Sequence, residues 1–227
     1  MPDATDRPLP GRQREARSND TAVLAAAREV FTAQGHDASM ADVARHAGVG
    51  VGSVYRRYPT KEALVAALHL HAVGEAARLV GEVADDGGDR VPSTWGGLLA
   101  AEDVGAVVTF LGRQITDATG PLLRPRGASS ALPPALAAAS EDLRVGLERL
   151  IAQDLAAGLV PVGLTAADVM QLLLHLRPAL PFPRERADAL HLRYLALLAR
   201  GLHEDARAGV VLADGPPWDE WVGAWRH

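Results

Sequence analysis

Apolar residues recur at the three- and four-residue spacing of helices along most of the chain. No segment alternates apolar and polar positions with enough β-branched side chains to indicate a strand. The pattern therefore predicts an all-α fold in which short helices precede longer Ala- and Leu-rich ones. The expected helices span about residues 18–35, 40–47, 51–58, 61–83, 95–118, 132–157, 165–177 and 184–206.

Local signals mark where several of these helices begin and end. Ser39 stands three residues before Asp42, and Thr165 three residues before Asp168, so both pairs can form capping boxes. Gly35 is a suitable stop for the first helix. Helices of seven or eight residues are marginal alone, so the N-terminal helices must share a small core. Its expected members are Phe31, Val43, Val49, Val54 and Tyr58.

The character of the helices changes near residue 62, beyond which long helices are separated by Pro- and Gly-rich breaks. We expect four parts: a flexible arm (1–17), a domain of short helices (18–62), a larger helical domain (63–209) and a tail (210–227). The tail holds three of the four tryptophans. We expect it to bury them against the larger domain, with the docking of a partner as the alternative.

Composition excludes several classes of protein. The chain has no cysteine, so it has no disulfide, thiol nucleophile or thiolate metal site. No apolar run approaches the roughly 20 residues of a membrane-spanning helix, and the polar N-terminus carries no secretory signal, so we expect a cytoplasmic protein without membrane contact. The Ala-, Arg- and Gly-rich composition, with Lys61 as the only lysine, suits a GC-rich bacterial genome.

Charge is uneven around a net value of -5. Residues 1–62 carry nine Arg and Lys against eight Asp and Glu, or +1, whereas residues 63–227 carry fourteen against twenty, or -6. A small basic surface on an acidic body suits a DNA-binding protein that should not bind every polyanion.

The segment Gly48-Val49-Gly50 joins two short helices, which is the pattern of a helix-turn-helix whose second helix enters the major groove of DNA. On that helix Val54 and Tyr58 lie four residues apart and can face the core. The outward positions are then Val51, Gly52, Ser53, Tyr55, Arg56 and Arg57. Such side chains can contact a thymine methyl (Val51), guanine (Arg56), and phosphates or base edges (Ser53, Tyr55, Arg57).

Lys61 stands at the first turn of the next helix, where a cation opposes the helix dipole and gains nothing from the fold. If a phosphate were bound at this helix end, the cation would be stabilised there instead of disfavoured. We therefore predict that Lys61 anchors a DNA phosphate; a solvated lysine is the alternative.

Residues 26–68, AAREVFTAQGHDASMADVARHAGVGVGSVYRRYPTKEALVAAL, resemble the DNA-binding domain of the TetR family of transcriptional regulators. The resemblance implies that DNA contacts come from Ser39, Ser53, Tyr55, Arg57 and Lys61, and that Val51 and Gly52 form the base-reading turn. Three positions depart from the family pattern. Gly50 replaces a capping Ser or Thr, Val51 replaces a polar residue, and Arg57 replaces a His, which favours phosphate contact over base discrimination.

The resemblance over residues 63–209 rests on organisation and on LERLIAQDLAAGLVPVGLTAADVMQLLL. It implies that helices 165–177 and 184–206 form a four-helix bundle with a second subunit. Independently, two helices with wide apolar faces need a cover, and a homodimer supplies it. The expected interface residues are Val169, Leu172, Leu173, Leu176, Leu190, Tyr194, Leu197 and Leu198.

Polar or aromatic groups within the apolar helices mark where an inducer would bind. The candidates are Trp95, Thr109, Phe110, Arg113, Gln114, Gln171, His175 and Arg177. Each has a structural alternative, since Arg113, Gln114 and Arg177 can face solvent or lie at the end of the helical bundle, and His175 can be a hydrogen-bonded interior histidine. No metal or cofactor is expected, because His69 and His71 lie two apart, a poor spacing for one metal.

The sequence thus predicts a DNA-binding regulator, a repressor that binds a near-palindromic operator as a homodimer and releases it with an unidentified small molecule. An enzyme is the first alternative, but the chain has no Gly-rich phosphate loop and no paired acid and base at useful spacing. A protein that binds a heterologous partner through its last helices and tail is the second.

Overall fold

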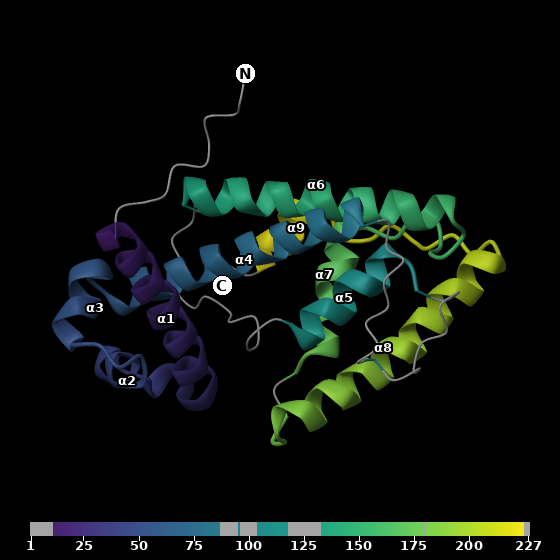
Figure 1. Ribbon diagram of the computed structural model, residues 1–227. Helices are drawn as coiled ribbons and strands as arrows, with labels where there is room; N and C mark the ends of the chain where they lie inside the picture. Colours follow the sequence, from purple (N-terminus) through teal and green to yellow (C-terminus); the bar gives the residue numbers. More distant parts are fainter. Residues whose placement is uncertain (1–10, 87–94, 96–103, 118–132, 179, 225–227) are drawn as a thin grey trace. The chain divides into compact units, whose positions relative to one another are not determined.

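The computed structural model describes residues 11–86, 95, 104–117, 133–178 and 180–224 (Figure 1). Regular structure in these ranges is helical, apart from one isolated parallel bridge between Val162 and Val211. The helices are α1 (Gly11–Gln34), the 3-10 helix η1 (Gly35–Asp37), α2 (Met40–His46), α3 (Val51–Arg57), α4 (Lys61–Asp85), α5 (Ala106–Thr116), α6 (Pro134–Ala156), α7 (Ala166–Leu176), α8 (Arg184–Arg207) and α9 (Trp218–Ala224). The predicted all-α fold is confirmed.

The chain forms two compact units, Met1–Leu68 and His69–His227. The division falls inside α4, so one continuous helix belongs to both units. The sequence predicts the domain boundary near residue 62, at the start of the same helix.

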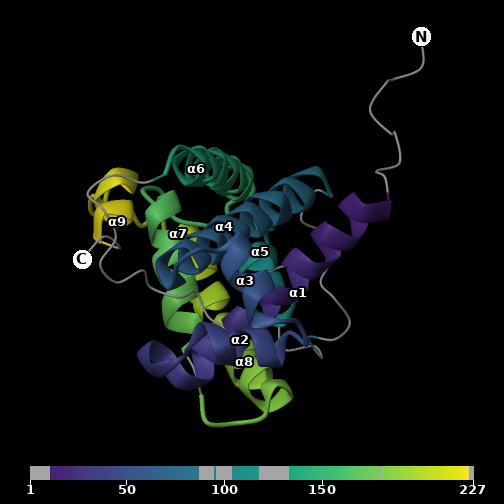
Figure 2. The same cartoon turned by 90° about the vertical axis from the view of Figure 1, so that its left-hand side faces the viewer.

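The N-terminal unit packs α1 against α2 and α2 against α3 (Figure 2). Val23, Ala27 and Val30 line the buried face of α1 at a spacing of three to four residues, as an amphipathic helix requires. The expected core residues Phe31, Val43, Val54 and Tyr58 are buried, and Val49 is half-buried.

The C-terminal end of the first helix lies where the sequence predicts it, and the N-terminal end does not. Gly35 ends it, with the φ of 59° that glycine adopts readily, and the chain continues as η1. The other end differs, because α1 begins at Gly11 rather than near residue 18. Residues 11–17, expected in a flexible arm, are therefore helical.

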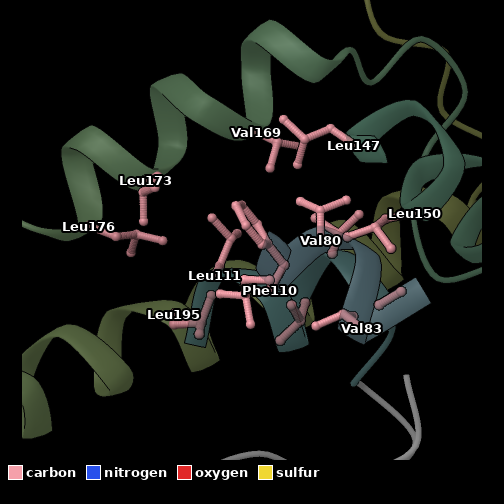
Figure 3. Close-up of a cluster of buried hydrophobic side chains, with 14 of the residues drawn as sticks. Val80, Val83, Phe110, Leu111, Leu147, Leu150, Val169, Leu173, Leu176 and Leu195 are labelled. Atoms are coloured by element: carbon pink, nitrogen blue, oxygen red, sulfur yellow. The ribbon is translucent and has the colours of Figure 1, made fainter. Parts of the chain in front are cut away.

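The core of the C-terminal unit surrounds α5, in which nine of eleven residues are buried. Figure 3 shows Phe110 and Leu111 among side chains from α4, α6, α7 and α8. Gly112 allows the closest approach in this core, since a Cβ there would lie 2.1 Å from the ring of the fully buried Trp95. The core thus needs a small residue on α5 opposite a large one.

Helix α5 begins at Ala106 rather than near residue 95, and residues 96–103 and 118 of the predicted helix lie outside the described residues. Gly105 is its N-cap residue and has no side chain to bond the first amides. Asp154 of α6 takes over that role, since its carboxylate accepts hydrogen bonds from the backbone N–H of Ala106 (2.7 Å) and of Val107 (2.8 Å). A Cβ at Gly105 would lie 2.5 Å from this carboxylate. The boundary of α5 is therefore set by a residue 48 positions away.

Burial raises the pKa of Asp154, and its two backbone hydrogen bonds act in the opposite direction. The carboxylate is 3% exposed, so each of its oxygen atoms depends on one of the α5 amides for a partner.

The C-terminal segment crosses the end of this core. The N–H of Leu212 donates to the carbonyl of Val162 (2.9 Å), and Gly215 lies against the carboxylate of Asp168. In α9, Trp218 and Trp221 stack with ring centroids 5.1 Å apart and pack against the core. These two tryptophans of the tail are therefore partly buried against the C-terminal core, and Trp225 lies outside the described residues.

By length and composition alone, α4 could cross a membrane, although no apolar run of that size was expected. Within this helix Leu64 and Leu68 are buried and Leu79, Val80 and Val83 belong to the C-terminal core, whereas Leu70 is exposed.

Candidate nucleic-acid interface

The turn between α2 and α3 fixes the position of the candidate surface. The Ser39 and Asp42 capping box that starts α2 is confirmed, with the Ser39 hydroxyl accepting from the Asp42 amide at 3.1 Å. At the other end Gly48 adopts a φ of 69°, and the N–H of Val49 donates to the Ala44 carbonyl at 3.0 Å. Glycine suits this left-handed position, which turns the chain into α3.

Helix α3 presents the outward face that its sequence predicts. Val54 and the C-cap residue Tyr58 are buried, whereas the outward positions are exposed, namely Val51, Gly52, Ser53, Tyr55, Arg56 and Arg57. Gly50 begins the helix in an extended conformation without a side-chain cap, as its sequence implies. The exposed set combines apolar, hydroxyl and guanidinium groups on two turns of one helix, which is the chemistry that reads base edges and phosphates.

Two pairs of residues order this face. The guanidinium of Arg56 donates to the hydroxyl of Ser53 at 3.2 Å, within α3. Arg57 forms an ion pair with Asp20 of α1. The role of Asp20 could not be predicted from the sequence, because its partner lies 37 positions away and no local pattern links the two residues.

The seam between α1 and α3 also contains Tyr58. Burial raises the pKa of its phenol, the nearby Asp20 carboxylate raises it further, and Arg57 acts in the opposite direction. A second contact joins α1 to α2, where the ring of His46 lies 2.5 Å from the carboxylate of Glu29.

Lys61 has a structural role that its sequence position does not reveal. Its ammonium lies 5.5 Å from the centroid of the buried Phe31 ring, a cation–π contact. The expectation that Lys61 gains nothing from the fold is therefore wrong. The alternative of a simple solvated lysine is also inaccurate, since the side chain is half-buried.

The candidate inducer-binding residues fall into two groups. Trp95, Thr109, Phe110 and Gln114 are buried in the C-terminal core, so the solvent-facing alternative for Gln114 is wrong. Arg113, Gln171, His175 and Arg177 are half-buried or exposed.

The second group has contacts near the surface. Arg113 pairs with Glu82 (3.0 Å) and Asp117 (3.2 Å). The side chains of Gln171 and His175 lie 2.9 Å apart. Because His175 is exposed, the alternative of an interior histidine is wrong.

The proposed dimer face requires a larger correction. Val169, Leu173 and Leu176 of α7 point into the core of their own unit, where Figure 3 shows them facing α5 and α8, so they are unavailable to a partner. Leu172, Leu190 and Leu198 are half-buried. Tyr194 and Leu197 of α8 are 54% and 51% exposed.

Two further polar groups lie in the interior of the C-terminal unit. The indole Nε1 of Trp95 is buried without a hydrogen-bond partner, and the His191 ring is also buried. Burial lowers the pKa of His191, and the charge of Arg177 lowers it further, while Asp188 and the backbone at Pro178 raise it. Over the part of the chain that the structure describes, no cluster of His, Asp or Glu could hold a metal ion.

Comparison with known proteins identifies the N-terminal unit. Residues 23–68 match the family model of bacterial regulatory proteins of the TetR family. No curated protein matches the chain.

Several solved structures are similar to the whole chain. A FadR transcriptional regulator from Bacillus subtilis, in complex with stearoyl-CoA, is 15% identical, with a TM-score of 0.50, and the match covers 84% of this chain and 98% of that one. A TetR transcriptional regulator from Streptomyces coelicolor is 27% identical, with a TM-score of 0.49 and coverage of 81% and 97%. A third, from Mycobacterium vanbaalenii, is 24% identical, with a TM-score of 0.49 and coverage of 84% and 98%.

Proposed function

We propose that the chain, whose residues 23–68 match the family model of TetR regulatory proteins, is a cytoplasmic repressor that binds a near-palindromic operator as a homodimer and releases it when a small molecule binds. The observation that carries the proposal is the exposed face of α3, which follows a glycine turn in a domain of the family. Two such faces, one from each subunit, would read successive major grooves about 34–36 Å apart.

The proposed repressor responds to a ligand of the C-terminal unit. Trp95 supports this, since its buried indole Nε1 lacks a protein partner and would donate a hydrogen bond to a ligand with polar groups. Helix α4 belongs to both units, so it is the element through which ligand binding would move α3. The similar FadR structure from Bacillus subtilis contains stearoyl-CoA.

Selection of duplexes from a random pool, at near-physiological salt, tests the proposal. The expected result is an inverted repeat whose half-sites lie one helical turn apart. Recovery of no common sequence by the folded protein would contradict sequence-specific binding. The same experiment distinguishes a regulator from the enzyme or partner-binding alternatives, which require no operator.

Lys61 is expected to contribute one phosphate contact at every duplex. Substitution Lys61→Gln should weaken binding to operator DNA and to random DNA by similar factors. It should also reduce the slope of log K against log salt by about 0.9. Lys61→Arg keeps the cation above Phe31 and serves as the control. An unchanged salt slope in Lys61→Gln would show that no phosphate is bound there.

Arg56 is expected to read a base. Substitution Arg56→Ala should relax the preference at one operator position and cost about 1–3 kcal/mol of discrimination there. The measurement is repeated duplex selection with the variant. Arg45→Ala is the control, because Arg45 is an exposed arginine of α2 that pairs with Asp42. A selected motif that is identical in Arg56→Ala and wild type would remove Arg56 from the reading surface.

A further inference from the structure

The ion pair between Arg57 and Asp20 places a carboxylate beside a predicted phosphate ligand. The Asp20 side chain is 20% exposed and that of Arg57 52%, so the acid lies in the seam between α1 and α3 while the guanidinium reaches solvent. The raised pKa of Tyr58 has the Asp20 charge as its second cause, which places the carboxylate close to the end of α3 as well.

This pair changes the electrostatics of the α3 face. Arg57 paired with Asp20 is nearly neutral as a unit, so a loosely docked DNA phosphate gains little from approaching it. A phosphate gains more when it replaces or joins the carboxylate as a close partner of the guanidinium, and this requires α3 to be seated fully in the groove.

We propose that Asp20 is a specificity-determining residue, which keeps Arg57 paired on non-specific DNA and yields it to a phosphate only on the operator. The inference rests on the proposed DNA-binding function and adds to it an acidic residue outside the helix-turn-helix. Asp20 acts through Arg57, so it is a positioning residue with respect to DNA.

Substitution D20N tests this assignment, because it keeps the size of the side chain and removes its charge. In D20N, Arg57 is available to phosphate on any duplex. Affinity for a scrambled duplex should rise about three- to fivefold, which is the range expected for loss of a competing exposed ion pair. The slope of log K against log salt on that duplex should steepen by about 0.9, the value for one additional phosphate contact. On the selected operator both quantities should change less, so the ratio of specific to non-specific affinity falls.

Two controls separate this mechanism from simple loss of an acid. E29Q removes one carboxylate from the same helix without touching Arg57, since Glu29 contacts His46. It should leave the salt slope of the scrambled duplex unchanged. In an R57Q background, D20N should have no effect on that slope, because the guanidinium through which Asp20 influences DNA binding is absent.

The outcomes distinguish this inference from the proposed function. Wild-type protein that binds the operator, together with a D20N slope equal to that of the wild type, overturns the role of Asp20 alone. An equal effect of D20N in the R57Q background, or of E29Q, overturns it as well. Wild-type protein that binds no duplex overturns both the function and the inference. If D20N does not fold by circular dichroism, D20S replaces it and the same slopes decide.

Discussion

Substitution Asp154→Ala is expected to lower the free energy of unfolding by about 3 kcal/mol. The carboxylate is the partner of the N–H groups of Ala106 and Val107, and both donors are in a buried environment. Removal of one partner of a buried hydrogen bond leaves the other to bear its desolvation cost, about 1–3 kcal/mol for each donor. Part of this cost is offset because burial of the carboxylate itself is unfavourable, as its raised pKa indicates.

Denaturant unfolding followed by circular dichroism measures this effect, with Asp142→Ala as the matched control. Asp142 is an exposed residue of the same helix, so its substitution should change the unfolding free energy by no more than about 0.5 kcal/mol. Equal unfolding free energies for the two variants would mean that the start of α5 does not depend on Asp154.

The double substitution Tyr194→Asp and Leu197→Asp is expected to convert the proposed dimer into a folded monomer. Both side chains are more than half exposed and lie three positions apart on α8, so they form one surface patch. Two carboxylates there would meet their symmetry mates across an isologous interface. Loss of the second half-site contact should weaken operator binding by about a hundredfold or more.

Sedimentation gives the oligomeric state of this variant, and operator titration gives its affinity. Val145→Asp is the control, because Val145 is 52% exposed on α6, away from the proposed interface. The control should remain dimeric with wild-type affinity. A dimeric Tyr194→Asp/Leu197→Asp variant would rule out this face of α8 as the interface.

Deletion of residues 165 onward is unsuitable as a test of the dimer. Such a deletion removes Val169 and Leu173 of α7 and Leu195 of α8 from the hydrophobic core of the C-terminal unit. The expected result is an unfolded C-terminal unit. Loss of dimerisation by an unfolded unit would not show which residues form the interface. Surface substitutions on α8 avoid this because they leave the core intact.

Features that depend on neighbouring residues were predictable from the sequence. The Ser39 and Thr165 capping boxes, the stop at Gly35 and the exposed face of α3 match their predictions. Each depends on residues within four positions of one another, so hydrogen-bonding reach and helical period determine the geometry directly. The family resemblance of the N-terminal residues has the same origin, since its motif is contiguous, and residues 23–68 match the family model.

The all-α class, most helix boundaries and the residues that α3 exposes could all be predicted from the order of the amino acids. Three contacts instead depend on how the helices pack: Asp20 pairs with Arg57, Asp154 accepts from the first amides of α5, and Lys61 lies above Phe31. Helix packing also decides that Val169 and Leu173 face their own core rather than a second subunit. An apolar face on a helix specifies that something must cover it, but burial is non-directional and does not specify what. Partners 37 or 48 positions apart are brought together by the packing of whole helices, and no local sequence pattern indicates that packing.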